Sequence, residues 1–188
     1  MSTDNSDQEN SVSQDDKLDA TGHMVVAVGA ASLNILAALH AASFEDVGDD
    51  PWDAVAFARM IAMPGCTALL VCVPGDKPKA LVPVGFAVFR VAADEAELLT
   101  IGVLPGARRK GAAESVMRHI ERSAVAGGAR HLILEVAQDN MAARQFYLRL
   151  GFKQVGQRPD YYSRANGPRV TAYILRRDLN ENEQKASN

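Results

Sequence analysis

The chain has 188 residues, of which 47% are hydrophobic and 23% are charged, a composition that fits one globular domain with a substantial core. It matches neither a fibrous protein nor a membrane-spanning one. The net charge of −3 argues against a general nucleic-acid-binding surface, although it is compatible with a local basic patch.

Both ends of the chain are polar. Residues 1–22 are rich in Ser, Asp, Asn and Gln, and they offer too little apolar surface to offset the entropy of ordering, so we expect a disordered acidic tail. The segment lacks the basic and apolar regions of a signal peptide. Residues 180–188 predict a second flexible tail, which leaves 23–179 as one domain. We expect a cytoplasmic protein in which Cys66 and Cys72 are reduced core thiols.

The front of the domain is predicted to be helical. A short apolar run at residues 23–28 precedes a helix at about 32–42. The segment FEDVGDDPWD then forms an acidic loop. Pro51 within it is suited to the first turn of a second helix, which we expect to run to about Met63.

The middle of the domain alternates strands with one helix. Two strands are predicted at 68–73 and 81–91, joined by a turn at GDKP, and a third is predicted at Glu97–Val103. Apolar residues then recur at helical spacing from Gly111 until Gly127 and Gly128 end the helix.

The last third predicts a strand at His131–Ala137, a helix at Asn140–Leu150 and two closing strands at Phe152–Gln157 and Arg169–Leu175. Gly151 stands where a glycine commonly ends a helix. The order of elements therefore predicts a mixed α/β fold, with helices on the faces of one sheet.

The sequence ARRKGAAESVM, residues 107–117, places three cations and a glycine where a strand hands over to a helix. Helix amino-termini carry unpaired N–H groups and the positive end of the helix dipole, so this junction predicts an anion site, most simply for phosphate. Gly106 to Gly111 fits G-x-x-x-x-G, but Ala112 and Ala113 stand where a P-loop needs Lys and Ser/Thr. No G-x-G-x-x-G occurs, which disfavours a dinucleotide site.

The remaining pattern, [Q/R]-x-x-G-x-[G/A], resembles the acetyl-CoA signature of the GCN5-related N-acetyltransferase (GNAT) superfamily. The stretch HLILEVAQDNMAARQFYLRLGF resembles the strand, Asn-capped helix and closing glycine of the same family. With RPDYYSRANG downstream, the resemblance covers residues 95–179 and is closest to RimI-type ribosomal-protein-alanine N-acetyltransferases; PWDAVAFARM is similar to their front helix. It implies the GNAT fold, a central, mostly antiparallel sheet with a splayed parallel pair.

The chain departs from the family pattern at three places. Ala113 replaces the commoner glycine, Gly102 stands where an alanine-like residue is usual, and the acidic loop before Pro51 is longer than usual. The first two departures are compatible with cofactor binding. The third leaves the substrate open, because the resemblance implies that this loop borders the acceptor.

Two residues are candidates for catalysis. A carboxylate on a central strand is costly unless it is paired or functional, and Glu135 shares a strand face with Ile133, so we expect Glu135 to be the general base. The alternative is a charge at the strand end that reaches solvent. The resemblance implies that Tyr147 is the proton donor, although the apolar stripe of its helix also explains its ring by packing alone.

The other site predictions follow the resemblance. Asn140 is expected to be the helix N-cap and, in addition, a cofactor contact. Trp52, Tyr161 and Tyr162 are expected to bind the acceptor, with ordinary surface aromatics as the alternative for the two tyrosines. We expect no metal, because the four histidines show no ligand spacing. The predicted cofactor-binding residues are Ile101, Gly102, Val103, Arg108, Arg109, Lys110, Gly111, Ala112, Ala113, Glu114, Asn140 and Tyr147.

The resemblance implies an N-acetyltransferase that uses acetyl-CoA as co-substrate and acetylates a protein amino-terminus by direct attack. A lysine or a small-molecule amine is the alternative acceptor, and an acyl-CoA-binding sensor without turnover is the alternative from another class. Neither a membrane nor nucleic acid is an expected partner, and the sequence leaves the oligomeric state open.

Overall fold

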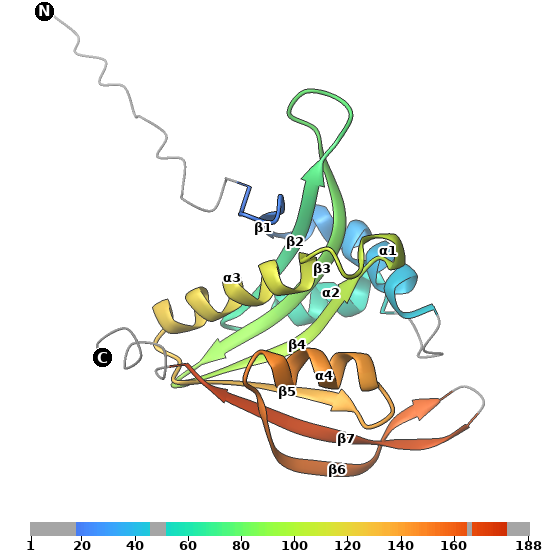
Figure 1. The fold of residues 1–188 in the computed structure, drawn as a ribbon, viewed down its shortest axis with the longest axis vertical. Helices are drawn as coiled ribbons and strands as arrows, with labels where there is room; N and C mark the ends of the chain where they lie inside the picture. The colour runs from blue at the N-terminus through green and yellow to red at the C-terminus, as the bar shows by residue number, and fades with distance from the viewer. Residues whose placement is uncertain (1–17, 46–51, 165–166, 180–188) are drawn as a thin grey trace, which may run out of the picture.

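The computed structural model describes residues 18–45, 52–164 and 167–179. A single sheet of seven strands, in the order β1-β2-β3-β4-β5-β7-β6, runs through the described part of the chain (Figure 1). The strands are β1 (Met24–Val28), β2 (Cys66–Pro74), β3 (Leu81–Ala92), β4 (Glu95–Val103), β5 (His131–Ala137), β6 (Lys153–Arg164) and β7 (Gly167–Asp178).

In the described residues, four α-helices cover the two faces of this sheet. Helices α1 (Leu33–Phe44) and α2 (Ala54–Ile61) pack on one face, around Phe57 and Phe86. Helices α3 (Ala112–Ala126) and α4 (Met141–Arg149) pack on the other, around Met117 and Phe152. The predicted mixed α/β class is therefore confirmed.

All the neighbouring strands in the sheet are antiparallel except β4 and β5, which are parallel. This pair stays in register only from Glu95–His131 to Leu98–Leu134. Beyond Leu98 the strands diverge, as Figure 1 shows for the green and orange ribbons. The expectation of a mostly antiparallel sheet with one splayed parallel pair is confirmed.

Several predicted boundaries need correction. Helix α2 begins at Ala54, because the side chain of Asp53 caps it by accepting a hydrogen bond from the Ala56 N–H (2.8 Å). The predicted start at Pro51 lies outside the described residues, as does most of the acidic loop. Strands β6 and β7 extend well beyond the predicted 152–157 and 169–175, so that Tyr161 and Tyr162 lie in a strand.

The expectation of disorder is wrong for residues 18–22. The carboxylate of Asp19 accepts hydrogen bonds from the Thr21 N–H (2.8 Å) and the His23 N–H (3.1 Å), and it pairs with Arg118 on α3 (2.9 Å). The polar composition of this segment predicts a tail, because composition alone does not reveal the ion pair with Arg118, which is distant in the sequence.

Within the described ranges no helix is long and apolar enough to cross a membrane. Cys66 and Cys72 are free thiols, and Cys72 is buried in the core beneath α1 and α2.

Candidate active site

The site lies where β4 and β5 separate. Past Thr100, β4 pairs only with β3, through Ile101–Ala87, Gly102–Phe86 and Val103–Gly85. The edge of β4 that faces β5 is therefore left open for an extended ligand arm to form β-like hydrogen bonds. Two cavities occupy the opening, and both are lined by Ile101, Ala143 and Tyr147.

The first cavity, of about 640 Å³, lies between the start of α3 and helix α4. It brings together nearly all of the predicted cofactor residues. Those that line it are Ile101, Gly102, Val103, Arg108, Arg109, Gly111, Ala112, Ala113, Glu114 and Tyr147.

The backbone of the loop before α3 fits a diphosphate. Arg109 (φ 63°) and Gly111 (φ 93°) both adopt left-handed conformations, which is uncommon for a residue such as arginine. Gly111 is the N-cap of α3 and provides no side-chain cap, so the first N–H groups of the helix are open to a ligand. Uncapped N–H groups at a helix start, with a cation beside them, are the donor set that holds phosphate.

The three cations of the loop play different parts. Arg108 donates from Nε to the carbonyl of Val103 (3.1 Å) and from Nη2 to the carbonyl of Ser43 (2.8 Å), so its guanidinium ties β4 to the end of α1. Lys110 donates to the carbonyl of Gly106 (2.9 Å) and does not line the cavity. Arg109 is thus the loop cation best placed to meet a phosphate charge.

Gly102 is explained by close packing. A Cβ at this position would lie 2.4 Å from the Phe86 ring and 2.9 Å from Cβ of Ser43, distances that a side chain cannot tolerate. The glycine that departs from the family pattern lets α1 approach β4 at the wall of the cavity.

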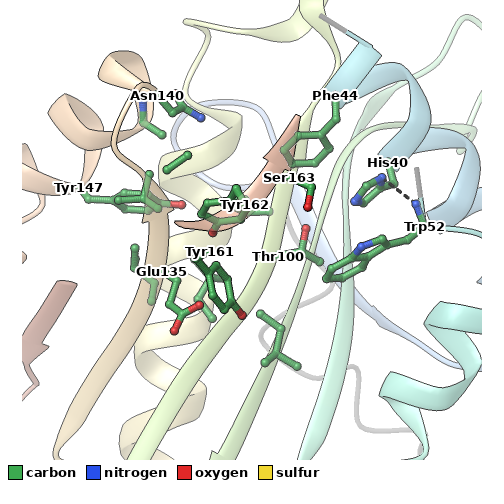
Figure 2. A pocket seen from close by; sticks show the side chains of 17 residues that line it. His40, Phe44, Trp52, Thr100, Glu135, Asn140, Tyr147, Tyr161, Tyr162 and Ser163 are labelled. Carbon is green, nitrogen blue, oxygen red and sulfur yellow. Dashed lines mark hydrogen bonds between the residues drawn. The ribbon is translucent and has the colours of Figure 1, made fainter. Parts of the chain in front are cut away.

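The second cavity, of about 390 Å³, lies on the opposite side of Tyr147. Figure 2 shows Glu135 and Tyr147 on one flank, and His40 and Trp52 on the other, with Tyr161 and Tyr162 between them. The predicted catalytic pair and the predicted acceptor residues therefore share one space. Asn140 also lines this second cavity and not the first.

Glu135 is held by Arg158 and by Tyr161, of which only Tyr161 lines the cavity. Its carboxylate forms an ion pair with Nε of Arg158 on β6 (3.1 Å) and is hydrogen-bonded to Tyr161. The Arg158 guanidinium also lies over the Tyr161 ring, 5.5 Å from the centroid. Partial burial, and then the negative charge of Glu135, raise the pKa of Tyr161, and Arg158 acts in the opposite direction. Sequence reasoning missed Arg158, because nothing in the local pattern indicates which strand faces Glu135.

Tyr147 is buried and packs against Phe146 and Phe152. Burial, followed by the neighbouring Tyr162, raises the pKa of Tyr147 well above its usual value. Its hydroxyl therefore keeps its proton at neutral pH and is available as a donor.

Asn140 caps α4 as predicted, since its side chain accepts a hydrogen bond from the Ala143 N–H (3.0 Å). This bond fixes the start of the helix that carries Tyr147. The predicted contact of Asn140 with the cofactor stays a prediction.

An aromatic wall closes the far side of the second cavity. His40 is buried and stacks on Trp52 at 5.1 Å, while its Nδ1 accepts a hydrogen bond from the Trp52 backbone N–H (3.3 Å). The ring hydrogen of His40 is therefore on Nε2. Sequence reasoning named Trp52 but missed His40, whose role depends on how α1 meets the segment before α2.

The tyrosines of the β6–β7 hairpin are positioned by an irregularity in β6. The register shifts between Arg158 and Tyr162, and Asp160 adopts a positive φ of 51°. Arg169 on β7 secures this bulge by donating to the backbone carbonyls of Asp160 (2.5 Å) and Tyr161 (3.0 Å). The bulge directs Tyr161 and Tyr162 into the cavity.

The described residues contain no cluster of three or more His, Cys, Asp or Glu side chains able to hold a metal ion.

The sequence was compared with protein families and with known proteins, and it is similar to acetyltransferases. The family model described as "Acetyltransferase (GNAT) family" matches residues 33–152. The chain is 37% identical over 136 residues to the N-alpha-acetyltransferase RimI of Mycobacterium tuberculosis, an alignment that covers 70% of this chain and 78% of the relative. It is 33% identical over 92 residues to the [Ribosomal protein bS18]-alanine N-acetyltransferase of Haemophilus ducreyi, covering 49% and 63%.

The fold also matches solved structures. Arabidopsis thaliana NAA60, solved in complex with acetyl-CoA, superposes with a TM-score of 0.69 at 16% identity, over 84% of this chain and 99% of that one. At this identity the match establishes the fold alone.

Proposed function

Since this chain belongs to the GNAT acetyltransferase family and is an acetyl-CoA-dependent N-acetyltransferase, we propose that its acceptor is the amino-terminal α-amine of a protein. The proposal also includes direct transfer, in which both substrates are bound together and no acetylated enzyme forms.

The observation that carries the proposal is the meeting of two cavities at Tyr147, with Glu135 facing only the second. One cavity has the donor set for a diphosphate, and the other has a carboxylate beside aromatic walls. Holding two reactants in adjoining spaces converts a bimolecular reaction into an effectively unimolecular one. Direct transfer therefore needs no nucleophile from the protein.

Acetyl-CoA, when bound, supplies a thioester carbonyl as the electrophile. The open N–H groups at Ala112, Ala113 and Glu114 would hold its diphosphate. The free edge of β4 from Ile101 to Val103 would align its extended arm, and a backbone N–H near Val103 would polarise the thioester carbonyl.

Proton transfers fall to Glu135 and Tyr147. As the new C–N bond forms and the C–S bond breaks, Glu135 takes a proton from the amine nitrogen, directly or through water. Tyr147 donates its hydroxyl proton to the departing sulfur. The positions of the two residues suit these roles. Glu135 lines only the second cavity, where the amine would bind, and Tyr147 lines both cavities and so lies between the amine and the thioester.

The choice of an α-amine rests on the relatives and on amine chemistry. Both relatives are named for amino-terminal acetylation, one of them of a ribosomal protein, and we propose a ribosomal protein in the cytoplasm as the acceptor here. An α-amine has a pKa near 7.7 to 8.0 and lysine one near 10.4, so lysine carries a handicap of roughly 3 to 4 kcal/mol at neutral pH. A single carboxylate acting as general base is therefore sufficient to deprotonate an α-amine.

Replacing Tyr147 with Phe is expected to lower kcat about 10- to 100-fold with little change in KM for acetyl-CoA. The effect is at the low end for general acid catalysis, because the departing thiol has a pKa of only about 8.5. Because the pKa of Tyr147 is raised, wild-type kcat should not fall between pH 7 and about 10 through its ionisation. Steady-state kinetics across this range test both expectations, and an unchanged kcat in Tyr147→Phe would remove Tyr147 from the mechanism.

The function itself is tested by thiol release from acetyl-CoA with a panel of acceptors. Lysine-free peptides that begin with Ala, Ser or Met should be acetylated, and the same peptides with formylated amino-termini should not. Turnover of blocked, lysine-containing peptides or of polyamines would favour the alternative acceptors. Failure of every acceptor, despite binding of acetyl-CoA, would indicate a sensor.

A further inference from the structure

Residues 19–23 form a tight turn around the carboxylate of Asp19. Its Oδ1 accepts hydrogen bonds from the Thr21 N–H (2.8 Å), the Thr21 hydroxyl (2.6 Å) and the His23 N–H (3.1 Å). Nδ1 of the buried His23 lies 2.8 Å from the same Thr21 hydroxyl. Two backbone hydrogen bonds close the turn. The Asp19 N–H donates to the carbonyl of His23 (2.7 Å), and the Gly22 N–H donates to the carbonyl of Asp19 (2.9 Å).

This turn is attached to the first turns of α3. Oδ2 of Asp19 pairs with Arg118 (2.9 Å), which also bonds Glu114 (3.0 Å), and Asp19 accepts a hydrogen bond from the Ser115 hydroxyl. Partial burial opposes ionisation of Asp19. The hydrogen bonds from Ser115, Thr21 and His23 outweigh it and lower the pKa of Asp19 well below its usual value.

The side chain of Thr21 packs against Gly111, the last residue of the diphosphate loop before α3. Two carbons of its side chain lie 3.2 Å from the place where a Cβ of Gly111 would stand. Gly111 lines the cofactor cavity, whereas Thr21 and Asp19 do not. The turn therefore supports the loop from behind, at the glycine whose φ of 93° directs the open N–H groups of α3.

We propose that Asp19 and Thr21 are positioning residues for acetyl-CoA, which act by fixing Gly111 and the first turn of α3 in the geometry that binds the diphosphate. Glycine adopts a φ of 93° without strain but is equally free to leave it, so the conformation of Gly111 depends on its surroundings. The turn at 19–23 restricts Gly111 on the side away from the ligand. The proposal rests on the loop being the diphosphate site and does not depend on which amine is acetylated.

The test compares KM for acetyl-CoA and kcat in variants of the turn. Asp19→Ala removes the ion pair to Arg118 and the four hydrogen bonds that the carboxylate accepts from Thr21, His23 and Ser115. It should raise KM for acetyl-CoA about tenfold, the size of one hydrogen bond to a charged group. Its kcat and its KM for the acceptor should change less than about twofold. Asp19→Asn keeps an acceptor oxygen for Thr21 and His23, so it should recover part of the loss.

Two truncations extend the test. A chain without residues 1–17 retains the turn and should match the full chain, whereas a chain without residues 1–22 should show the KM of Asp19→Ala.

Glu121→Gln is the matched control for general destabilisation. Glu121 lies on α3 farther from the loop, and the substitution breaks its ion pair with Arg177 on β7. It should lower the melting temperature without changing KM for acetyl-CoA. An unchanged KM in Asp19→Ala, or an equal rise in KM in Glu121→Gln, would overturn the proposal. Absence of any acetyl-CoA binding by the full chain, measured by calorimetry, would overturn the loop assignment together with it.

Discussion

Replacing Glu135 with Gln is expected to slow acetylation of an Ala-initiated peptide by about 10² to 10⁴ at neutral pH, the range that general base catalysis usually contributes. The amide keeps the shape of the side chain but cannot accept the proton. Part of the loss should be recovered at high pH, because a larger fraction of the acceptor amine is then already free. The measurement is kcat and kcat/KM of both proteins as a function of pH.

Arg158→Gln is the control for this substitution. Glu135→Gln also breaks the ion pair with Arg158, and a partly exposed pair of this kind is worth only about 0.2 to 1 kcal/mol. Arg158→Gln breaks the same pair and leaves the carboxylate in place, so its rate should fall less than about fivefold. Equal losses in the two variants, or no loss in Glu135→Gln with any acceptor, would show that Glu135 is not the base.

Replacing Gly111 with Val is expected to abolish stabilisation by acetyl-CoA. At a ligand concentration of 100 Kd, binding adds about 2.7 kcal/mol, or about 5 to 10 °C in melting temperature for a chain of this size. Valine is strongly disfavoured at a φ of 93°, and its Cβ would lie 3.2 Å from Thr21, so the loop must move and the first N–H groups of α3 must turn with it.

Gly106→Ala is the control in the same loop. Its added Cβ meets nothing within 4 Å, and the ligand-induced shift should be preserved. Thermal unfolding with and without acetyl-CoA measures the shift, and unfolding without ligand verifies that Gly111→Val folds. A full shift in a folded Gly111→Val would rule out this loop as the diphosphate site.

Elements bounded by strong local signals could be predicted from the sequence. The strand at His131–Ala137 was predicted with its observed bounds, because its apolar run is followed by the Asn140 cap and the helix that ends before Gly151. The splayed parallel pair followed from resemblance to the family. Local pattern alone would not have revealed which two strands run parallel.

Features that depend on distant residues were missed. The stretch around Arg158 and Asp160 has the composition of a loop, yet it is held in β6 by pairing with β7 and by Arg169. Asp19 lies in a segment that has the composition of a disordered tail, yet Arg118, 99 residues later, helps to order it. Local sequence also gives no sign that the Arg108 guanidinium bonds the backbone carbonyls of Val103 and Ser43, while its predicted contact with the cofactor stays a prediction.

The most direct test of α-amine acetylation uses one peptide that offers both kinds of amine. The peptide begins with Ala, has a free amino-terminus and contains one internal lysine; after incubation with the protein and acetyl-CoA, fragmentation mass spectrometry locates the acetyl group. We predict acetylation at the α-nitrogen, and at most about 1% as much product when Glu135→Gln replaces the wild-type protein for the same short time at neutral pH. Acetyl on the lysine, with the α-amine left free, would contradict the proposed function.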